Sequence, residues 1–279
     1  MSINTAISKW IEKSEPDFYT LFIKSWIPYN SWYMHNYADE DASRTSDRDI
    51  IEYIKSNPNA YKNKISALLQ GSGDESDEFK QLICKLHYCL ESNPIPDFDN
   101  KISFYAICIR GNSKRQETIQ EKTFSVKGIV DLNLPKKDAR WVFEIIDNKS
   151  MSTISRIALH KCSTKELHNN ADYISLEVKY KSSVERCLNE INPDKKESVI
   201  VQAVRRGSKY SQPANSIVIS NNDNLYFIDN VDDVSRAIIH ILYELRCKLF
   251  HGEIDPTTSN SGIYEQAFYI QRMLIKALN

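Results

Sequence analysis

Glycine is scarce in this chain, and its scarcity leaves two large classes of nucleotide-binding protein without support. Only seven of the 279 residues are glycine, and they form neither the loop of P-loop NTPases nor the fingerprint of dinucleotide-binding folds. The six cysteines are scattered, without a C-x-x-C pair or a Cys/His group at zinc-ligand spacing. We therefore expect reduced thiols, no metal site and no cofactor.

The chain also lacks an excess of charge and a long apolar run. Lys and Arg total 36 against 37 Asp and Glu, so any nucleic-acid site must be local rather than a property of the whole surface. The segment from Met1 to Thr5 has neither the basic start nor the apolar run of a signal peptide, and no stretch reaches the length of a membrane span. We expect a soluble, cytoplasmic protein without a membrane partner.

Hydrophobic spacing is helical at both ends of the chain. It predicts helices from Thr5 to about Asn93, with Pro28 kinking or interrupting the first, a new helix near Asp47 and a break at residues 71–74. From Asn230, a good N-cap residue, the helical pattern returns and runs to a stop at Gly252. A last helix is predicted over 264–278.

The middle of the chain has a different pattern. Alternating apolar residues predict strands over 102–108, 124–132 and 141–146, a hairpin over 216–228, and a helix over 173–191. The fold class expected is therefore α+β. Its predicted parts are a helical domain made of 1–96 and 230–279, and an inserted mixed α/β region over 97–229.

An Arg and a His with four residues between them lie at the end of the 231–251 helix. On an ideal helix Arg246 and His251 point about 140° apart, so a long Arg side chain or a second subunit must close the gap between them. One interpretation is an exposed helix terminus, where both side chains complement the helix dipole. The other interpretation is a catalytic pair.

The end of this helix resembles the R-x4-6-H signature of the HEPN-domain family, in the residues from Leu242 to Gly252 and including the aromatic-His-Gly ending. The resemblance is to the ribonuclease-like HEPN proteins of the Apea-like type. Residues 22–33, with Trp26, Asn30 and Tyr33, resemble the first-helix pattern of the same domains. The resemblance covers about 1–93 and 230–279, and it implies a HEPN-like helical bundle built from the two ends of the chain.

This resemblance implies a metal-independent endoribonuclease that works as a homodimer. Arg246 and His251 of each copy are then the catalytic residues in a cleft between protomers, and RNA is the substrate. A histidine can take the proton from a ribose 2′-hydroxyl or protonate the leaving oxygen, and an arginine stabilises the charge of the transition state. A toxin or antiphage defence effector, with an antitoxin or regulatory partner, fits this chemistry.

Further residues are expected to contact the substrate. Those near the motif are Asn30, Cys247 and Lys248. Those in a basic stretch of the middle region are Arg205, Arg206 and Lys209, which can grip a phosphate backbone or simply form solvated surface. Cys247 stands where active members often have Asn, Asp or His. That departure and the neutral overall charge favour the alternative, a non-catalytic HEPN-like module that dimerises or holds a nucleotide or another ligand.

Overall fold

The chain folds as two compact units. A computed structural model describes residues 7, 14, 16–38, 46–97, 100–107, 115–131, 133–135, 137–192, 195–207 and 209–278, so Thr5, Cys108 and Leu132, at the ends of expected elements, lie outside the described residues. Unit 1 comprises Met1–Ile109 and Lys196–Asn279, and unit 2 comprises Arg110–Lys195. The inserted unit is thus shorter than the region of changed pattern, 97–229. The mixed α+β class is confirmed.

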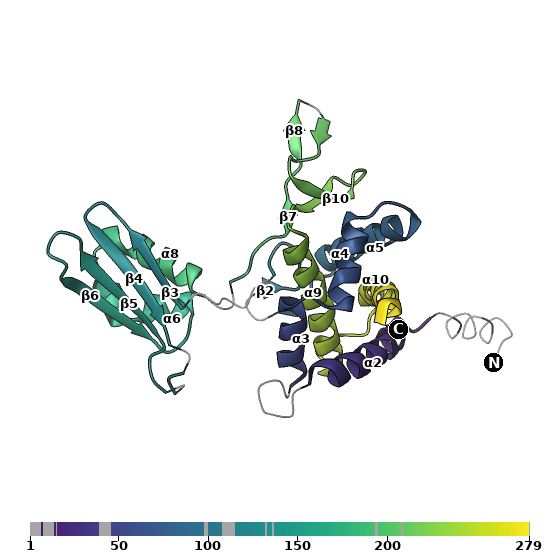
Figure 1. The fold of residues 1–279 in the computed structure, drawn as a ribbon, viewed down its shortest axis with the longest axis horizontal. Coiled ribbons are helices and arrows are strands. Elements are labelled where there is room, and N and C mark those ends of the chain that lie inside the picture. The colour runs from purple at the N-terminus through teal and green to yellow at the C-terminus, as the bar shows by residue number, and fades with distance from the viewer. Residues whose placement is uncertain are drawn as a thin grey trace. The chain divides into compact units, whose positions relative to one another are not determined.

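Helices from both ends of the chain pack together in unit 1 (Figure 1). The N-terminal part contributes α2 (Phe18–Tyr37), α3 (Asp47–Ser56), α4 (Ala60–Gln70) and α5 (Asp74–Ser92), and the C-terminal part contributes α9 (Val231–Phe250), α10 (Thr258–Ile275) and a 3-10 turn (Lys276–Leu278). Helix α10 packs on α2 and α5, while α9 packs on α3 and α4. Their shared core is rich in aromatic rings: Phe22, Trp26, Tyr29, Tyr33, Tyr61 and Tyr264.

The predicted helix ends are confirmed at the positions that carry the site. Ser46 caps α3, and Asp47 lies in its first turn. Asn230 caps the start of α9, which ends at Phe250, and Gly252 with φ of +67° lies two residues beyond that end. Of the two outcomes expected at Pro28, an interruption is wrong, because α2 runs through this residue, and a kink stays a prediction. Pro28 has no amide hydrogen to donate to the carbonyl of Lys24, one turn earlier. Both residues are exposed, so water can bind this carbonyl instead.

Short strands of unit 1 pack beside the helices. Strands β1 (Pro96–Asp97) and β2 (Asn100–Lys101) form one pair, and β8 (Val204–Arg206) and β9 (Lys209–Ser211) form another. The predicted hairpin is confirmed as β10 (Ser216–Ser220) and β11 (Leu225–Ile228), and β7 (Ile200–Val201) is the other neighbour of β11. The strand predicted over 102–108 is wrong within the described residues 102–107, because the Ala106 amide donates to the Ser103 carbonyl and closes a turn.

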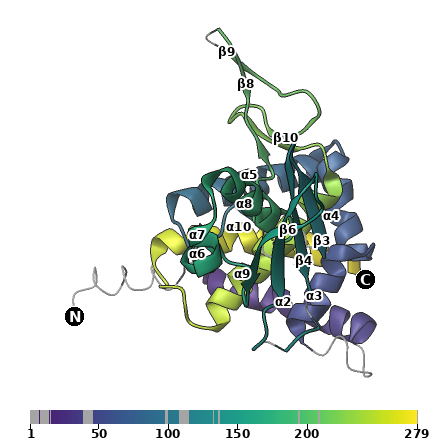
Figure 2. The ribbon, with the colours of Figure 1, turned by 90° about the vertical axis from the view of Figure 1, so that its left-hand side faces the viewer.

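Unit 2 has a core of its own. Strands β3 (Gln116–Gln120), β4 (Phe124–Val130), β5 (Trp141–Asp147) and β6 (Thr153–Leu159) form an antiparallel meander, followed by α6 (Thr164–Asn169), α7 (Ala171–Ser175) and α8 (Val178–Glu190). Figure 2 shows the meander beside these helices. Helix α8 packs on β3 and β4. The helix predicted over 173–191 is thus two helices, interrupted at Leu176 and Glu177.

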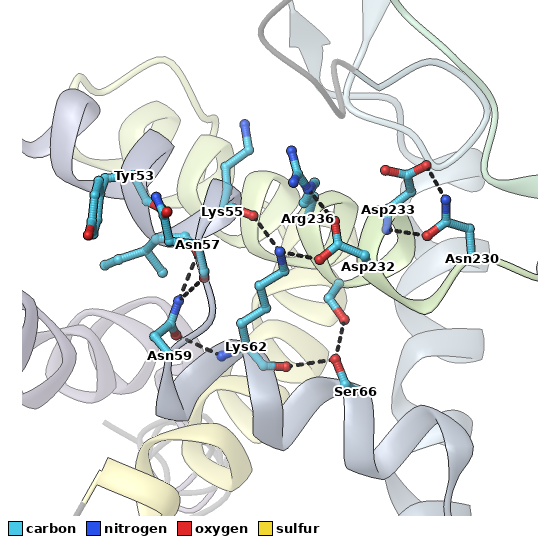
Figure 3. Close-up of polar contacts among 12 residues, drawn as sticks. Tyr53, Lys55, Asn57, Asn59, Lys62, Ser66, Asn230, Asp232, Asp233 and Arg236 are labelled. Carbon is cyan, nitrogen blue, oxygen red and sulfur yellow. Dashed lines mark hydrogen bonds and ion pairs between the residues drawn. The ribbon is translucent and has the colours of Figure 1, made fainter.

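A polar network holds the N-terminal end of α9 against α3 and α4 (Figure 3). The buried Lys62 ammonium pairs with Asp232 and donates to the Lys55 carbonyl at 2.8 Å. Arg236 donates to the same carboxylate at 2.7 Å. The Asn59 amide group donates to two carbonyls at the end of α3. The buried Lys62 ammonium is therefore paired and hydrogen-bonded, whereas an unpaired buried cation is costly. The network also fixes the N-terminal end of α9, and the C-terminal end of the same helix carries Arg246 and His251.

Candidate catalytic site at the end of helix α9

Arg246 is held firmly on one side. Its Nη2 donates to Asp47 Oδ2 at 2.8 Å, with the Arg246 and Asp47 side chains 18% and 31% exposed. Its Cζ lies 4.4 Å from the centre of the Phe250 ring, a cation–π distance. Within the described residues, Nη1 meets only the Cys247 sulfur at 4.0 Å, and the buried Nε has no acceptor. The guanidinium is therefore oriented, yet one outer nitrogen lacks an oxygen partner.

A chain of hydrogen bonds supports Asp47 from helix α2. The Tyr33 hydroxyl donates to Asp47 Oδ1 at 3.0 Å, and the Asn30 amide donates to the same hydroxyl. Burial is the main cause that raises the pKa of Tyr33, so this hydroxyl stays a neutral donor at neutral pH. The structure thus brings Asn30 into one network with Arg246. The sequence pattern does not point to Asp47 or Tyr33 as site residues, because an acidic residue at position 47 predicts only the start of a helix.

His251 ends helix α9 and faces solvent. Its backbone amide donates to the Cys247 carbonyl at 3.0 Å, and the chain then turns away at Gly252. The imidazole is exposed and has no hydrogen-bond partner within the described ranges. An exposed imidazole at a helix end is free to meet a substrate or a second copy of the chain. The expected cleft between two copies stays a prediction.

The residues that follow Arg246 have partners inside the chain. Cys247 is half-buried and is hydrogen-bonded to Tyr243, whose pKa is raised well above its ordinary value, mainly by burial. Lys248 donates to Glu253 Oε2 at 2.6 Å, and this bond raises the pKa of Lys248. The Lys248 ammonium therefore ties the helix to the loop that follows it. Substrate contacts by Cys247 and Lys248 stay predictions.

The basic stretch does not lie beside Arg246. It forms the β8–β9 hairpin, where Arg205 Nε donates to the Gly207 carbonyl at 3.2 Å; the side chains of Arg206 and Lys209 lie outside the described residues. Figure 1 shows the hairpin beyond the N-terminal end of α9, whereas the motif is at the C-terminal end. A helix of 20 residues is about 30 Å long. The hairpin is thus a separate surface from the candidate site.

A second polar group on α9 is internal. His240 Nδ1 lies 3.4 Å from the Lys55 ammonium. Burial, followed by the positive charge of Lys55, lowers the pKa of His240 to about 3. His240, Asp97 and Glu244 are among the residues that line a cavity of about 10 Å³, a space of roughly one water molecule. His240 is therefore neutral in the folded chain and acts in packing.

None of the protein-family models compared with the chain matches it, and neither does any curated protein or solved structure.

In the part of the chain that the structure describes, no helix combines the length and hydropathy needed to cross a membrane. The same residues contain no group of three or more His, Cys, Asp or Glu side chains placed to hold a metal ion. The geometry of Arg246, Asp47 and His251 therefore carries the functional argument.

Proposed function

We propose that this chain is a metal-independent endoribonuclease of the HEPN type, in which Arg246 and His251 of two copies share one cleft. The observation that carries the proposal is the state of the Arg246 guanidinium. Asp47 and Phe250 orient it, yet Nη1 lacks an oxygen acceptor within the described residues. The same helix ends at an exposed His251. The motif resemblance at both ends of the chain supports the same assignment.

The groups present suit cleavage by the neighbouring 2′-hydroxyl. His251 of one copy takes the proton of this hydroxyl, whose oxygen forms a bond to phosphorus. The bond from phosphorus to the 5′-oxygen breaks, and a second imidazole protonates the leaving oxygen. Nη1 of Arg246 donates to a non-bridging phosphate oxygen, where negative charge develops. The products are a 2′,3′-cyclic phosphate and a 5′-hydroxyl.

One observation favours the alternative, a non-catalytic module that dimerises or binds a nucleotide. The Arg246–Asp47 ion pair joins α9 to α3, and such a tie gives Arg246 a structural role without any chemistry. If that role is its only one, substitution of Arg246 lowers the free energy of unfolding, whereas substitution of His251 changes neither stability nor activity. The two functions therefore differ most clearly at His251, whose exposed side chain makes no hydrogen bond within the described residues.

The test is RNA cleavage by the full chain in EDTA, comparing His251→Ala with His160→Ala. His160 is an exposed histidine of unit 2, so it controls for the loss of an imidazole. We expect His251→Ala to lower the cleavage rate at least about 100-fold, the ordinary contribution of one acid–base group, with an unchanged unfolding midpoint and oligomeric state. His160→Ala keeps full activity.

Full activity in His251→Ala, or an inactive wild-type chain, contradicts the ribonuclease and favours the binding module. A terminal cyclic phosphate, detected by its resistance to phosphatase, identifies the 2′-hydroxyl route. We propose the toxin or defence role on the same basis. Expression of the wild-type chain should slow growth, and expression of His251→Ala should not.

A further inference from the structure

The exposed tyrosines gather at one place in unit 1. All fifteen tyrosines belong to the described residues, and only Tyr88, Tyr105 and Tyr210 are exposed, with 42%, 44% and 56% of their surfaces accessible. All three line a single cavity of about 220 Å³. They come from helix α5, the turn after β2, and strand β9. Large aromatic rings kept at the surface by three separate segments suggest a ligand that stacks.

A buried histidine forms the wall of this cavity. His87 is 3% exposed, and its ring centre lies 5.1 Å from that of Tyr88 and 5.5 Å from that of Tyr105. Its Nδ1 has no hydrogen-bond partner within the described residues. Burial lowers the pKa of His87, so the imidazole stays neutral. The wall is thus aromatic and uncharged.

The polar groups of the cavity are neutral or already paired. The carboxylate of Asp223 accepts from Ser220 and from the Cys84 thiol, and the Tyr88 hydroxyl donates to the Asp223 carbonyl at 3.2 Å. Gln202 also lines the cavity, directly after β7, which forms the edge of its sheet. A glutamine amide offers one donor and one acceptor side by side, the arrangement that reads a base edge.

We propose that this cavity binds a nucleobase, stacked on Tyr105 and Tyr210 and hydrogen-bonded by Gln202. A cavity of about 150 Å³ holds a benzene molecule, so the space here suits one heterocyclic ring system. It is too small for the sugar and phosphates, which then lie outside. The β8–β9 hairpin that carries Tyr210 also has Arg205, Arg206 and Lys209 in its sequence, and this charge suits a phosphate backbone.

The base has two sources, an RNA strand and a free nucleotide. The choice of RNA rests on the proposed function, whereas the nucleobase chemistry does not. The cavity lies with the hairpin at the N-terminal end of α9, away from Arg246. A strand that reaches both places on one copy must therefore be several nucleotides long, and the cavity acts as an anchor rather than as part of the catalytic site.

The experiment measures binding of the full chain to a fluorescent single-stranded oligonucleotide with 2′-O-methyl riboses, which cannot be cleaved by 2′-hydroxyl attack. The variants are Tyr105→Leu and Tyr210→Leu. Val204→Ala is the control, because Val204 is an exposed residue of the same hairpin that does not line the cavity. Each tyrosine variant should weaken binding about 5- to 150-fold, the ordinary effect of one stacking ring. The control should bind like the wild type.

Two further probes separate base from backbone and strand from nucleotide. An abasic oligonucleotide of equal length should bind as weakly as the tyrosine variants do. AMP and UMP are then tested as competitors of the fluorescent oligonucleotide. Competition that is lost in Tyr105→Leu shows that a free nucleotide is enough for binding, and no competition shows that the cavity requires an RNA strand. Equal binding of the abasic and normal strands, unchanged binding in both tyrosine variants, or no binding of any probe overturns the proposal. Because the 2′-O-methyl oligonucleotide cannot be cleaved, binding is measured independently of cleavage, and a failure of the cleavage test leaves this result intact.

Discussion

The Asp47–Arg246 pair is the contact on which the candidate site depends, and it can be measured by a double-mutant cycle. A hydrogen bond to a charged group contributes about 1.5–3 kcal/mol when buried, and an exposed ion pair about 0–1 kcal/mol. The Arg246 and Asp47 side chains are 18% and 31% exposed, so the pair lies between these cases. We expect a coupling free energy of about 1–2 kcal/mol.

The single variants should differ in a defined order. Asp47→Ala also loses the bond from Tyr33 and an acidic group in the first turn of α3, so we expect a total loss of about 2–3 kcal/mol in the free energy of unfolding. Asp47→Asn keeps an oxygen that accepts from Arg246, and it should lose about half as much. Asp47 is a positioning residue, so its effect on cleavage should be partly rescued in Asp47→Asn.

Urea unfolding followed by tryptophan fluorescence provides the measurement. Of the four tryptophans only Trp141 belongs to unit 2, so a Trp141→Phe background makes the signal report unit 1 alone. The cycle compares Asp47→Ala, Arg246→Ala and the double variant in this background. A coupling below about 0.5 kcal/mol, the ordinary scatter of independent sites, refutes the claim that Asp47 holds the guanidinium in place.

Two other predictions concern the interiors of the two units. The folded-state pKa of His240, about 3, lies below its ordinary value of 6.5, so the stability it contributes is complete above pH 6.5 and declines towards pH 3, by up to about 1.4 kcal/mol per pH unit. His240→Asn should flatten this decline in urea titrations, and an unchanged pH slope contradicts the reasoning. In unit 2, a Cβ at Gly128 meets the Cys187 sulfur at 2.6 Å. Gly128→Ala should therefore cost about 1–3 kcal/mol in thermal unfolding, and Cys187→Ala should restore part of it; an unaltered midpoint argues against close packing there.

Local signals predicted the helix that carries the motif, since the cap at Asn230 and the stop at Gly252 act within one turn of their own positions. The contact between Arg246 and Asp47 joins residues 199 positions apart, and no periodicity in the sequence contains that information. The same limit applies to the cavity, because three distant segments each contribute one tyrosine. An exposed tyrosine and a core tyrosine look alike until the packing is known.

Pattern also identifies a strand without showing what the strand packs against. Alternation marked Ser216 to Ile228 correctly as a hairpin, yet the hairpin belongs to the helical unit and not to the inserted one. Its apolar side packs on α5, and β11 packs on α9. The boundaries of the inserted unit, Arg110 and Lys195, therefore follow from tertiary packing rather than from the change of hydrophobic period near residue 97.

The antiparallel bridge between Ile107 and Glu197 explains how a helical core can be built from two distant parts of the chain. The Ile107 amide donates to the Glu197 carbonyl at 3.0 Å, and the reverse bond is 2.9 Å long. The chain thus leaves and re-enters unit 1 at neighbouring points, and unit 2 closes as a loop with its own core. Because the entropy of loop closure grows only with the logarithm of loop length, and unit 2 orders its residues by its own packing, the insertion costs the helical unit little. The register of α9 against α3, on which the Arg246–Asp47 contact depends, is then set by packing within unit 1.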